Sequence, residues 1–511
     1  EDDDDDDDGI LDSSDACPSG NHGWSSNLSS DHDSDGCQDD LHWSGPEIPF
    51  TESAVAFDGA GNSYHMGLFH GTLQLGGHTL QNDDMFYRYC YNRMESWGVE
   101  NGFVAKLLAN GTWDWVIEID SGQGGGSTSF CASWAGTGLF NLELEDIAVD
   151  QGGNVTIVGS CMEDLEISGV THQCGWEGHH SDRDLMVARI GASGALDWLE
   201  TGESTQCNNT DCRGTEQAKA VAMDDEGNAY VTGFFCQGYE GGQCTLSLGA
   251  VQASGAENSG YGHWNFGGVT FVAKVDGSGQ WQWAQSAGTE YSTASSGVGI
   301  ALTEDDGVLV TGLFNIGTNQ NYMMSFGYSG IEIDSNSSWR NGAFVARTEA
   351  DGSGWTWARG WDTYGRSDDN LNNYPVMVEP TGDGNAVIST RLDWNNTLGT
   401  HDVNVTLAVG SEGTGDPYST ILLASISDDG VWRWAHTTGE TDDEQYPHSL
   451  SVTNSGAIHL AGSFDSSDIT FGDLVLREAD PSAVDDGTYR SFVAVADTNG
   501  SWTGATEMWE G

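Results

Sequence analysis

The fold is decided by four short pieces: AVAMD at residues 220–224, GNAYVTG at 227–233, FVAK at 271–274 and WQWA at 281–284. Each piece is apolar, and the Gly-Asn pair between the first two is typical of a tight turn. We therefore expect four consecutive β-strands. Strict alternation in WQWA predicts that Trp281 and Trp283 lie on one face of the last strand, which a neighbouring sheet would bury.

The same four pieces recur six times along the chain. Their common reference positions are Gly67, Gly159, Gly233, Gly312, Thr390 and Gly462. Four strands in each repeat of about 80 residues indicate propeller blades, because one antiparallel sheet cannot cover its own faces. We expect an all-β protein with a six-bladed β-propeller of four-stranded antiparallel blades with loop insertions, able to close a ring. The blades are expected at about 50–122, 142–203, 216–289, 296–362, 373–440 and 446–511.

The repeat resembles the β-propeller repeats of large secreted prokaryotic proteins. The resemblance lies in the frame DDEGNAYVTGFF at 224–235 and the frame FVAKVDGSGQWQWA at 271–284. It implies a propeller over residues 46–511, and says little about activity, since propellers include lectins, scaffolds and enzymes. The fifth and sixth repeats depart most, because Thr390 replaces the glycine and neither has a basic residue after its third strand.

The first residues of the chain have the spacing of a calcium-binding loop. Carboxylates at alternate positions can turn inward together around Gly9, and the carbonyl of Ile10 supplies a further oxygen. The expected ligands of this loop are Asp4, Asp6, Asp8, Ile10, Asp12 and Asp15. The other interpretation of this stretch is a solvated acidic tail.

A second loop repeats the spacing and strengthens the calcium prediction. Its ligands would be Asp31, Asp33, Asp35, Cys37 through its carbonyl, and Asp39. His42 is a poor ligand at the last position, so the loop is either weaker or completed by Asp40, Glu47 or another chain. The two loops together resemble thrombospondin type 3 repeats, which implies a bond between Cys17 and Cys37. We expect residues 1–45 to form an irregular Asp-rich arm that binds Ca²⁺.

The chain is strongly acidic, with 79 Asp and Glu against 16 Lys and Arg and a formal net charge of −63. Such a surface repels nucleic acid and anionic membranes and attracts cations. A saline environment would favour the same composition. The sequence has no apolar signal core and no membrane span, and we expect a processed or excised segment with neither nucleic-acid partners nor membrane insertion.

Cysteines and glycosylation sequons point to an extracellular, oxidising compartment. The cysteines pair by proximity as Cys17 with Cys37, Cys90 with Cys131, Cys161 with Cys174, Cys207 with Cys212, and Cys236 with Cys244. The candidate glycosylation sites are Asn27, Asn110, Asn154, Asn208, Asn336, Asn395, Asn404 and Asn499. An alternative for one group is zinc, with ligands among Cys161, His172, Cys174, His179 and His180.

Three functions from different classes remain. The first is a non-enzymatic extracellular surface protein, stabilised by calcium, that adheres or self-assembles as a filament or surface-layer subunit. Its partners would be other copies of itself, other cell-surface proteins or glycans. The second is a lectin-like propeller that stacks glycans on Trp97, Trp134, Trp176, Trp264, Trp339, Trp361 or Trp394. The third is a glycoside hydrolase, which requires paired carboxylates in the central channel.

Overall fold

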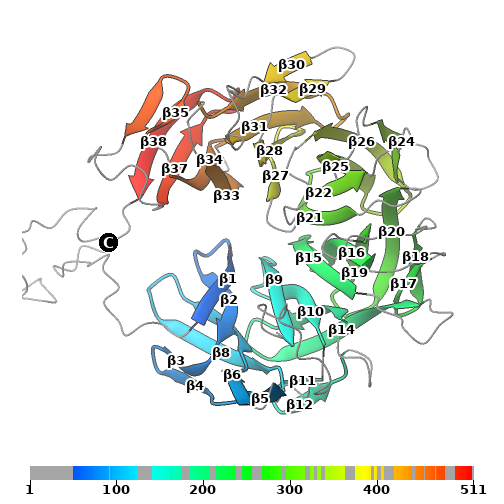
Figure 1. The fold of residues 1–511 in the computed structure, drawn as a ribbon, viewed down its shortest axis with the longest axis vertical. Coiled ribbons are helices and arrows are strands. Elements are labelled where there is room, and N and C mark those ends of the chain that lie inside the picture. The colour runs from blue at the N-terminus through cyan, green and yellow to red at the C-terminus, as the bar shows by residue number, and fades with distance from the viewer. Residues whose placement is uncertain are drawn as a thin grey trace, which may run out of the picture. The chain divides into compact units, whose positions relative to one another are not determined.

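The structure is a computed structural model, and every regular element in its described residues is a β-strand (Figure 1). The all-β prediction is confirmed. These residues belong to one compact unit, Pro49–Met508. The described residues are 50–90, 93–122, 141–162, 164–174, 183–205, 215–237, 244–255, 268–289, 295–305, 307–316, 323–326, 331–334, 340–362, 375–392, 396–399, 404–407, 419–439, 444–453, 455–465, 468–477 and 489–508.

Each repeat forms a four-stranded antiparallel sheet whose strands follow one another in chain order. The first sheet contains β1 (Phe50–Phe57), β2 (Ser63–Phe69), β7 (Asn101–Leu107) and β8 (Trp113–Asp120), and the second β9 (Leu142–Val149), β10 (Val155–Cys161), β13 (Asp184–Ile190) and β14 (Leu196–Thr205). The third contains β15 (Thr215–Met223), β16 (Ala229–Gln237), β19 (Val269–Val275) and β20 (Trp281–Thr289), and the fourth β21 (Ser295–Leu302), β22 (Gly307–Ile316), β25 (Arg340–Glu349) and β26 (Trp355–Asp362). The fifth contains β27 (Val376–Pro380), β28 (Asn385–Leu392), β31 (Thr420–Ser427) and β32 (Trp432–Thr437), and the sixth β33 (Gln445–Val452), β34 (Ile458–Phe464), β37 (Arg490–Ala496) and β38 (Trp502–Met508).

Each repeat has a short hairpin between its second and third strands. They are β3 (Gly71–Leu75) with β4 (His78–Asn82), β11 (Leu165–Ile167) with β12 (Val170–His172), β17 (Thr245–Leu248) with β18 (Val251–Ser254), β23 (Met323–Phe326) with β24 (Ile331–Asp334), β29 (Asn396–Gly399) with β30 (Asn404–Leu407), and β35 (Asp468–Phe471) with β36 (Leu474–Arg477). The first repeat has a second hairpin, β5 (Met85–Cys90) with β6 (Arg93–Gly98). Strands β11, β17 and β23 each pair with the fourth strand of the preceding sheet. A repeat therefore completes the sheet made before it.

Consecutive sheets pack face to face through five apolar clusters. Each cluster takes its residues from two neighbouring sheets, for example Tyr64 and Met66 of the first sheet with Ile157 and Met186 of the second. The other four clusters join the second to the third, the third to the fourth, the fourth to the fifth and the fifth to the sixth sheet. A sixth cluster lies within the first sheet and its own hairpin.

The six sheets are not joined into a closed ring. The innermost strands β1, β9, β15, β21, β27 and β33 contact one another in this order, but among the described residues β33 makes no comparable contact with β1. Figure 1 shows the first and sixth sheets separated. The expected closure by six blades is therefore not shown, whereas the repeated four-stranded antiparallel sheet is.

The prediction that Trp281 and Trp283 share one face is wrong. Trp281 packs between the second and third sheets, and Trp283 packs between the third and fourth. The reason is a β-bulge: Trp283 lies opposite Lys274 and Trp281 opposite Val275, so one extra residue separates the two indoles. A bulge reverses the alternation of side chains beyond it. The pairs Trp113 and Trp115, Trp355 and Trp357, and Trp432 and Trp434 are divided in the same way.

Candidate functional site

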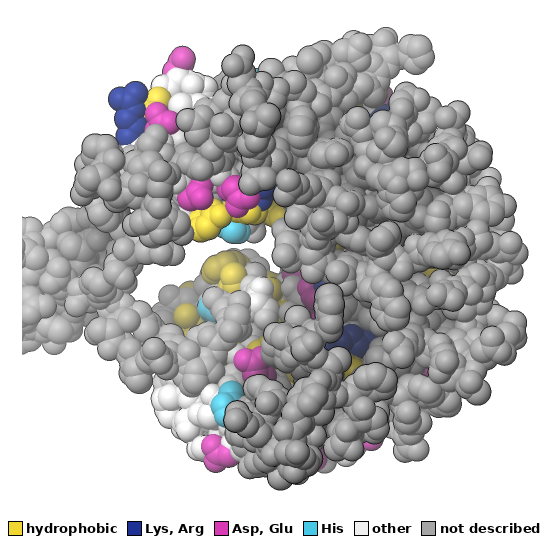
Figure 2. Space-filling model, viewed as in Figure 1, with side chains coloured by type: hydrophobic (Ala, Val, Ile, Leu, Met, Phe, Trp, Pro, Cys, Tyr) yellow, Lys and Arg dark blue, Asp and Glu magenta, His cyan; other side chains and the backbone are white. Residues whose placement is uncertain are grey.

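The innermost strands surround a central opening, with β9 and β27 on different sides of it (Figure 1). The space-filling view shows a hollow at this centre, in which apolar, acidic and basic side chains are visible (Figure 2). Concave regions with a few convergent polar groups are where proteins bind small ligands. The opening is therefore the candidate site.

Five of the six innermost strands carry a β-bulge at the same place in the repeat, opposite the reference glycine. Glycine is needed there: a Cβ at Gly159 would meet the carbonyl oxygen of Glu143, and a Cβ at Gly233 would meet that of Gln217. The fifth repeat has Thr390 instead, and β27 pairs without a register shift. Bulges re-aim side chains at the rims of barrels and next to functional sites. The residues added by the bulges are Ser53, Glu145, Lys219, Val298 and His448.

Two of these added residues form an ion pair between neighbouring sheets. Nζ of Lys219 lies 2.6 Å from Oε1 of Glu145, and both side chains are largely buried. The pair joins β9 to β15 beside the opening. Its partial burial makes it stronger than an exposed pair, because solvent screens it less.

Asp146 follows the bulge of β9 and is held by two backbone donors. The amide of Val221 donates to its Oδ2 at 2.9 Å, and its neighbour Ile147 donates to Oδ1 at 2.8 Å. Burial raises the pKa of Asp146 to about 6, although both hydrogen bonds lower it, and the charge of Glu145 raises it further. This carboxyl group therefore exchanges its proton near neutral pH.

Glu379 on β27 is a second carboxyl group with a raised pKa. Burial raises the pKa of Glu379 to about 7, and the charge of Asp146 raises it further. The two groups come from sheets that are not neighbours: Asp146 is on β9 and Glu379 on β27, and both strands border the central opening. Groups whose pKa values lie near the working pH can transfer protons, and they concentrate at functional sites.

The sequence interpretation missed both carboxyl groups, although a comparison of the repeats contains a signal. In the registers of the six sheets, Asp146 stands where the other repeats have Ala54, Ala220, Gly299, Met377 and Ser449. Glu379 stands where they have Ala56, Ala148, Ala222, Ala301 and Ser451. A carboxylate at a position that is otherwise mostly small marks a specialised repeat.

A polar network lies at the end of the opening where β9 and β15 begin. Nη2 of Arg183 lies 3.1 Å from Oε1 of Glu143, and Nη1 donates to Oγ of Ser160 at 3.3 Å. Gln217 donates to the same Glu143 carboxylate, and Ser204 donates to Glu216. Burial lowers the pKa of Arg183, and the nearby carboxylates oppose that shift. The network fixes the ends of three strands around the opening.

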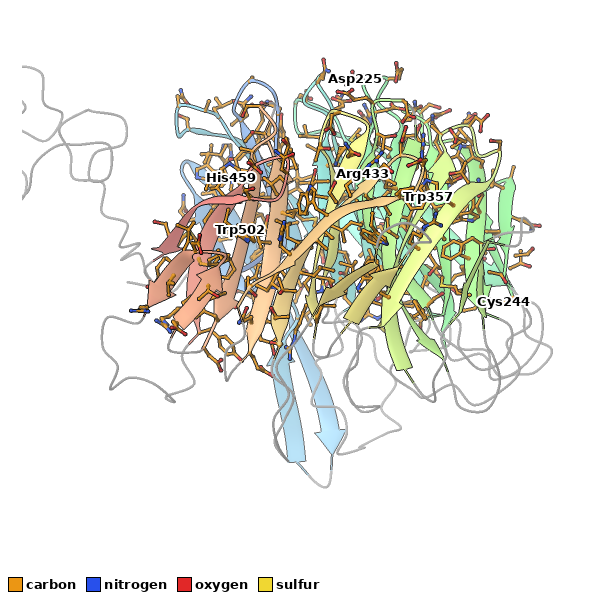
Figure 3. All side chains as sticks on the ribbon, turned by 90° about the horizontal axis from the view of Figure 1, so that it is seen from above. Asp225, Cys244, Trp357, Arg433, His459 and Trp502 are labelled. Atoms are coloured by element: carbon orange, nitrogen blue, oxygen red, sulfur yellow. A yellow bond between two sulfur atoms is a disulfide. The ribbon has the colours of Figure 1, made fainter. Side chains whose placement is uncertain are left out.

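The two ends of the sheets differ in character. Because strands alternate in direction, every connection between the second and third strands, and between one sheet and the next, leaves from one end, which we call the loop face. The other end carries the short turns, which we call the turn face. Figure 3 shows Asp225 at the turn face, with the β5–β6 hairpin at the opposite end. The Arg183 network lies at the loop face.

Aspartates at the turn face are structural. Asp150 accepts hydrogen bonds from the amides of Gly152 at 2.8 Å and Asn154 at 2.9 Å. Burial raises its pKa, but the bonds from Asn154 and the neighbouring Arg189 hold the pKa of Asp150 below its usual value. Nη2 of Arg189 lies 2.7 Å from Asp150, and Nη1 donates to the carbonyl of Gly227 in the following sheet. Arg189, Lys274 and Arg347 recur at one position of the repeat, and each forms an ion pair with an aspartate of its own sheet, so these cations are structural.

Indole hydrogen bonds reinforce each contact between sheets. Nε1 of Trp283 donates to the carbonyl of Ala350 in the following sheet at 2.9 Å. The equivalent donors are Trp115, Trp198, Trp357 and Trp434, each bonded to a turn of the sheet that follows. The tryptophans of the fourth strands are therefore structural.

The four described cysteines with placed side chains are bonded as two pairs, Cys161 with Cys174 and Cys236 with Cys244. The first bond excludes a zinc site that uses Cys161 and Cys174 as thiolates. The described residues contain no group of three or more His, Cys, Asp or Glu that could hold a metal ion. Figure 3 labels Cys244 on the third repeat.

Many predicted site residues lie outside the described part of the chain. These are Asp4, Asp6, Asp8, Ile10, Asp12, Asp15, Asp31, Asp33, Asp35, Cys37 and Asp39 of the calcium loops, the cysteines Cys17, Cys131, Cys207 and Cys212, and the sequons at Asn27, Asn208, Asn336 and Asn395. Asn110 and Asn499 are exposed in turns, and Asn154 is half-buried with its amide bonded to Asp150. Of the seven tryptophans proposed for glycan stacking, Trp361 is buried in the core.

A shallow pocket of about 610 Å³ lies between the fourth and fifth sheets. It is lined by Arg347, Thr356, Trp357, Arg359, Asp428 and Asp429. Its cations already have partners in the fifth sheet, since Arg347 donates to the carbonyl of Asp428 and Arg359 to that of Gly430. The pocket is therefore a seam between sheets, and the opening remains the better candidate.

Comparisons with known proteins give little beyond the all-β class. No family model matches the chain, and no curated protein matches it. Rhamnogalacturonan lyase YesW is 10% identical over 88% of this chain and 74% of its own, with a TM-score of 0.26. The extracellular domain of BT4673 from B. thetaiotaomicron, described as a one component system, is 9% identical over 91% and 78%, with a TM-score of 0.12.

One expectation changes with these comparisons, and one stays a prediction. The prediction that the chain is not an enzyme is wrong, because an enzyme, the rhamnogalacturonan lyase, is among the similar structures. At these TM-scores neither likeness indicates a particular activity. The resemblance of the arm to thrombospondin type 3 repeats has no matching family model and stays a prediction. The described residues contain no helix that could cross a membrane.

Proposed function

We propose that the chain is an extracellular surface protein in which the six sheets are blades of a β-propeller, and that it adheres to carbohydrate through the loop face. One observation carries the proposal: the strands that lead into the long connections end on the loop face, where the polar network of Arg183 also lies. Binding residues concentrate on loops that a rigid scaffold positions. The turn face, by contrast, is occupied by short turns that bond to the neighbouring sheet.

Carbohydrate is the favoured ligand because of the tryptophans that the sheets do not use. Trp134, Trp176, Trp264, Trp339 and Trp394 belong to connections that begin and end at the loop face, and Trp97 lies on β6. Aromatic rings stack on the apolar faces of sugars, and their polar edges bind hydroxyl groups. An extracellular location agrees with the two disulfides.

Calcium binding by the arm is the second part of the proposal. Residues 1–45 would hold Ca²⁺ with the two sets of aspartate ligands named above, because no Lys or Arg precedes Arg88 to neutralise them. Bound calcium stabilises the state that binds it by mass action. The arm would then be a rigid spacer.

A glycan array tests the adhesion proposal directly. We expect binding to one class of glycan, and we expect Trp176→Ala and Trp264→Ala to weaken it at least tenfold, about 1.4 kcal/mol. The matched control is Glu226→Ala, an exposed residue of the turn face, which should leave binding unchanged. Wild-type protein that binds no glycan, or a control that weakens binding equally, would contradict the proposal.

A second candidate function is acid–base chemistry in the opening, and the raised pKa values of Asp146 and Glu379 favour it. Near neutral pH one group can be protonated while the other is ionised, which is the arrangement that acid–base cleavage of glycosidic bonds requires. Incubation with acidic and neutral polysaccharides, followed by measurement of reducing ends, tests this candidate. Cleavage that persists in Glu379→Gln would exclude Glu379 as its acid.

A further inference from the structure

Among the described residues, no other sheet covers β1 on the outward face of the first sheet, whose outer part packs on its own β3–β4 hairpin. Val55 and Phe57 on β1 are 44% and 68% exposed, although the following sheets bury or half-bury the residues at the same positions. The opposite side of β1 packs on the second sheet through Ala54 and Ala56. Val55 and Phe57 therefore point to the side where a preceding sheet would lie.

The sixth sheet exposes the complementary side. In the second sheet every residue of β13 is buried, whereas β37 alternates between buried and half-buried residues. The buried residues, such as Phe492 and Ala494, face the fifth sheet. The other face carries the small or short residues Ala461, Val493, Val495, Gly504 and Thr506, with His459 and the exposed Met508 beside them. The small residues leave room for projecting side chains such as Phe57.

The hairpins show which sheets keep an open outer edge. Strands β11, β17 and β23 pair with the fourth strand of the sheet before them. Strand β3 has the same place in the first repeat but pairs only with β4, as β29 pairs only with β30 and β35 only with β36. At the other end, β38 is an edge strand without a paired hairpin among the described residues, as are β26 and β32. An open edge strand is a template for pairing with another chain.

One residue distinguishes a contact between these two free ends from the five contacts between neighbouring sheets within the chain. Gly504 stands at the position of Trp115, Trp198, Trp283, Trp357 and Trp434, whose indoles bond to the next sheet. In the first sheet, the turn glycine at the receiving position is Gly111, and a Cβ added to it would have no atom within 4 Å. A contact between these ends would lack the indole hydrogen bond, worth about 1 kcal/mol, and would be the weakest in the series.

We propose that the sixth sheet of one copy packs on the first sheet of a second copy, so that the chain assembles head to tail. The partner is a second copy because the five internal clusters fix the angle between consecutive sheets, and closing the gap within one chain would require all five to repack. The new contact continues an interface that the chain already makes five times. A head-to-tail contact forms a ring or an open filament.

The charge of the chain makes this assembly dependent on salt. Copies with a formal net charge of −63 repel one another at low ionic strength. In about 1 M NaCl the screening length falls to about 3 Å, so the apolar contact can form. The assembly does not depend on carbohydrate binding, since the two free faces are sides of sheets and the proposed glycan site is at the loop face.

Sedimentation velocity of the full chain in this high-salt buffer, over a range of concentrations, tests the proposal. The variants are Phe57→Glu on the first sheet and Thr506→Glu on the sixth, both exposed positions that should not affect folding. The control is Val170→Glu on β12, a residue that is 55% exposed and away from both faces. We expect wild type and the control to associate as concentration rises, and each of the two variants alone to remain monomeric.

A mixture of the two variants gives the decisive result. Phe57→Glu keeps an intact sixth sheet and Thr506→Glu keeps an intact first sheet, so a one-to-one mixture should form dimers that cannot grow further. Wild type that stays monomeric would overturn the proposal and indicate closure within one chain. Association of Phe57→Glu alone, or failure of the mixture to form dimers, would also overturn it.

Discussion

Replacing Gly233 with alanine tests the bulges that line the opening. A Cβ at this position would meet the carbonyl oxygen and carbon of Gln217 on β15. That carbonyl belongs to the antiparallel pairing of β15 with β16, so it cannot turn away without loss of backbone hydrogen bonds. We expect the bulge to shift and the ion pair of Lys219 with Glu145 to lengthen.

The expected cost follows from two opposing terms. Overpacking against backbone costs about 3 kcal/mol, at the upper end of its usual range, and alanine is better than glycine in a strand by about 1 kcal/mol. The free energy of unfolding should therefore fall by about 2 kcal/mol. Gly504→Ala is the matched control, because it is also a strand glycine but has no atom within 4 Å of the added Cβ.

Urea unfolding followed by tryptophan fluorescence measures both variants. We expect Gly504→Ala to be neutral or slightly stabilising, and Gly233→Ala to lower the midpoint without a change in slope. Equal free energies of unfolding for the two variants would refute the reasoning, because they would show that the bulge tolerates a side chain opposite it.

Four further predictions follow from features described above. The pKa of Glu379 is raised from 4.5 to about 7, so the neutral form of this carboxyl group favours the folded state. The free energy of unfolding of wild type, measured relative to Glu379→Gln, should be highest below pH 4.5 and fall by about 1 to 3 kcal/mol as pH rises through about 7. Urea titrations at several pH values measure this difference. Trp283→Phe should cost about 1 kcal/mol more than Trp281→Phe, since the indole nitrogen of Trp283 bonds to the next sheet and that of Trp281 is buried without a partner; equal losses would contradict the role of that bond. Replacing Cys161 and Cys174 together with alanine should lower the free energy of unfolding by about 3 kcal/mol, and no change in thermal midpoint would contradict a structural role of that bond. Chelation of calcium should lower thermal stability, and an unchanged melting curve with and without chelator would count against the arm as a calcium site.

Much of the fold could be predicted because the residues of each strand and its turn specify that strand by themselves. The apolar pieces around Gly227 and Phe271 form strands as expected, since turns and alternation act over a few residues. The positions of Trp281 and Trp283 could not be predicted, because the bulge between them adds a residue without changing the pattern of apolar and polar letters. Closure of the ring depends on the angle between packed sheets, which no single repeat specifies.

The candidate site was less predictable than the fold. Asp146 and Glu379 are separated by more than two repeats, and among 79 acidic residues neither is distinctive by type. Only the pairing register identifies them as carboxylates at positions that are otherwise mostly small. Departures from the repeat did carry information, since Thr390 in place of glycine coincides with the one innermost strand that has no bulge.

The hairpins have a consequence for how the protein is made. Because β11, β17 and β23 complete the outer edge of the sheet before them, a sheet leaving the ribosome stays unfinished until the next repeat emerges. Synthesis proceeds at about 5–20 residues per second, so the outer edge of each of the first three sheets stays exposed for several seconds. Each of these three sheets is completed only after the repeat that follows it has emerged.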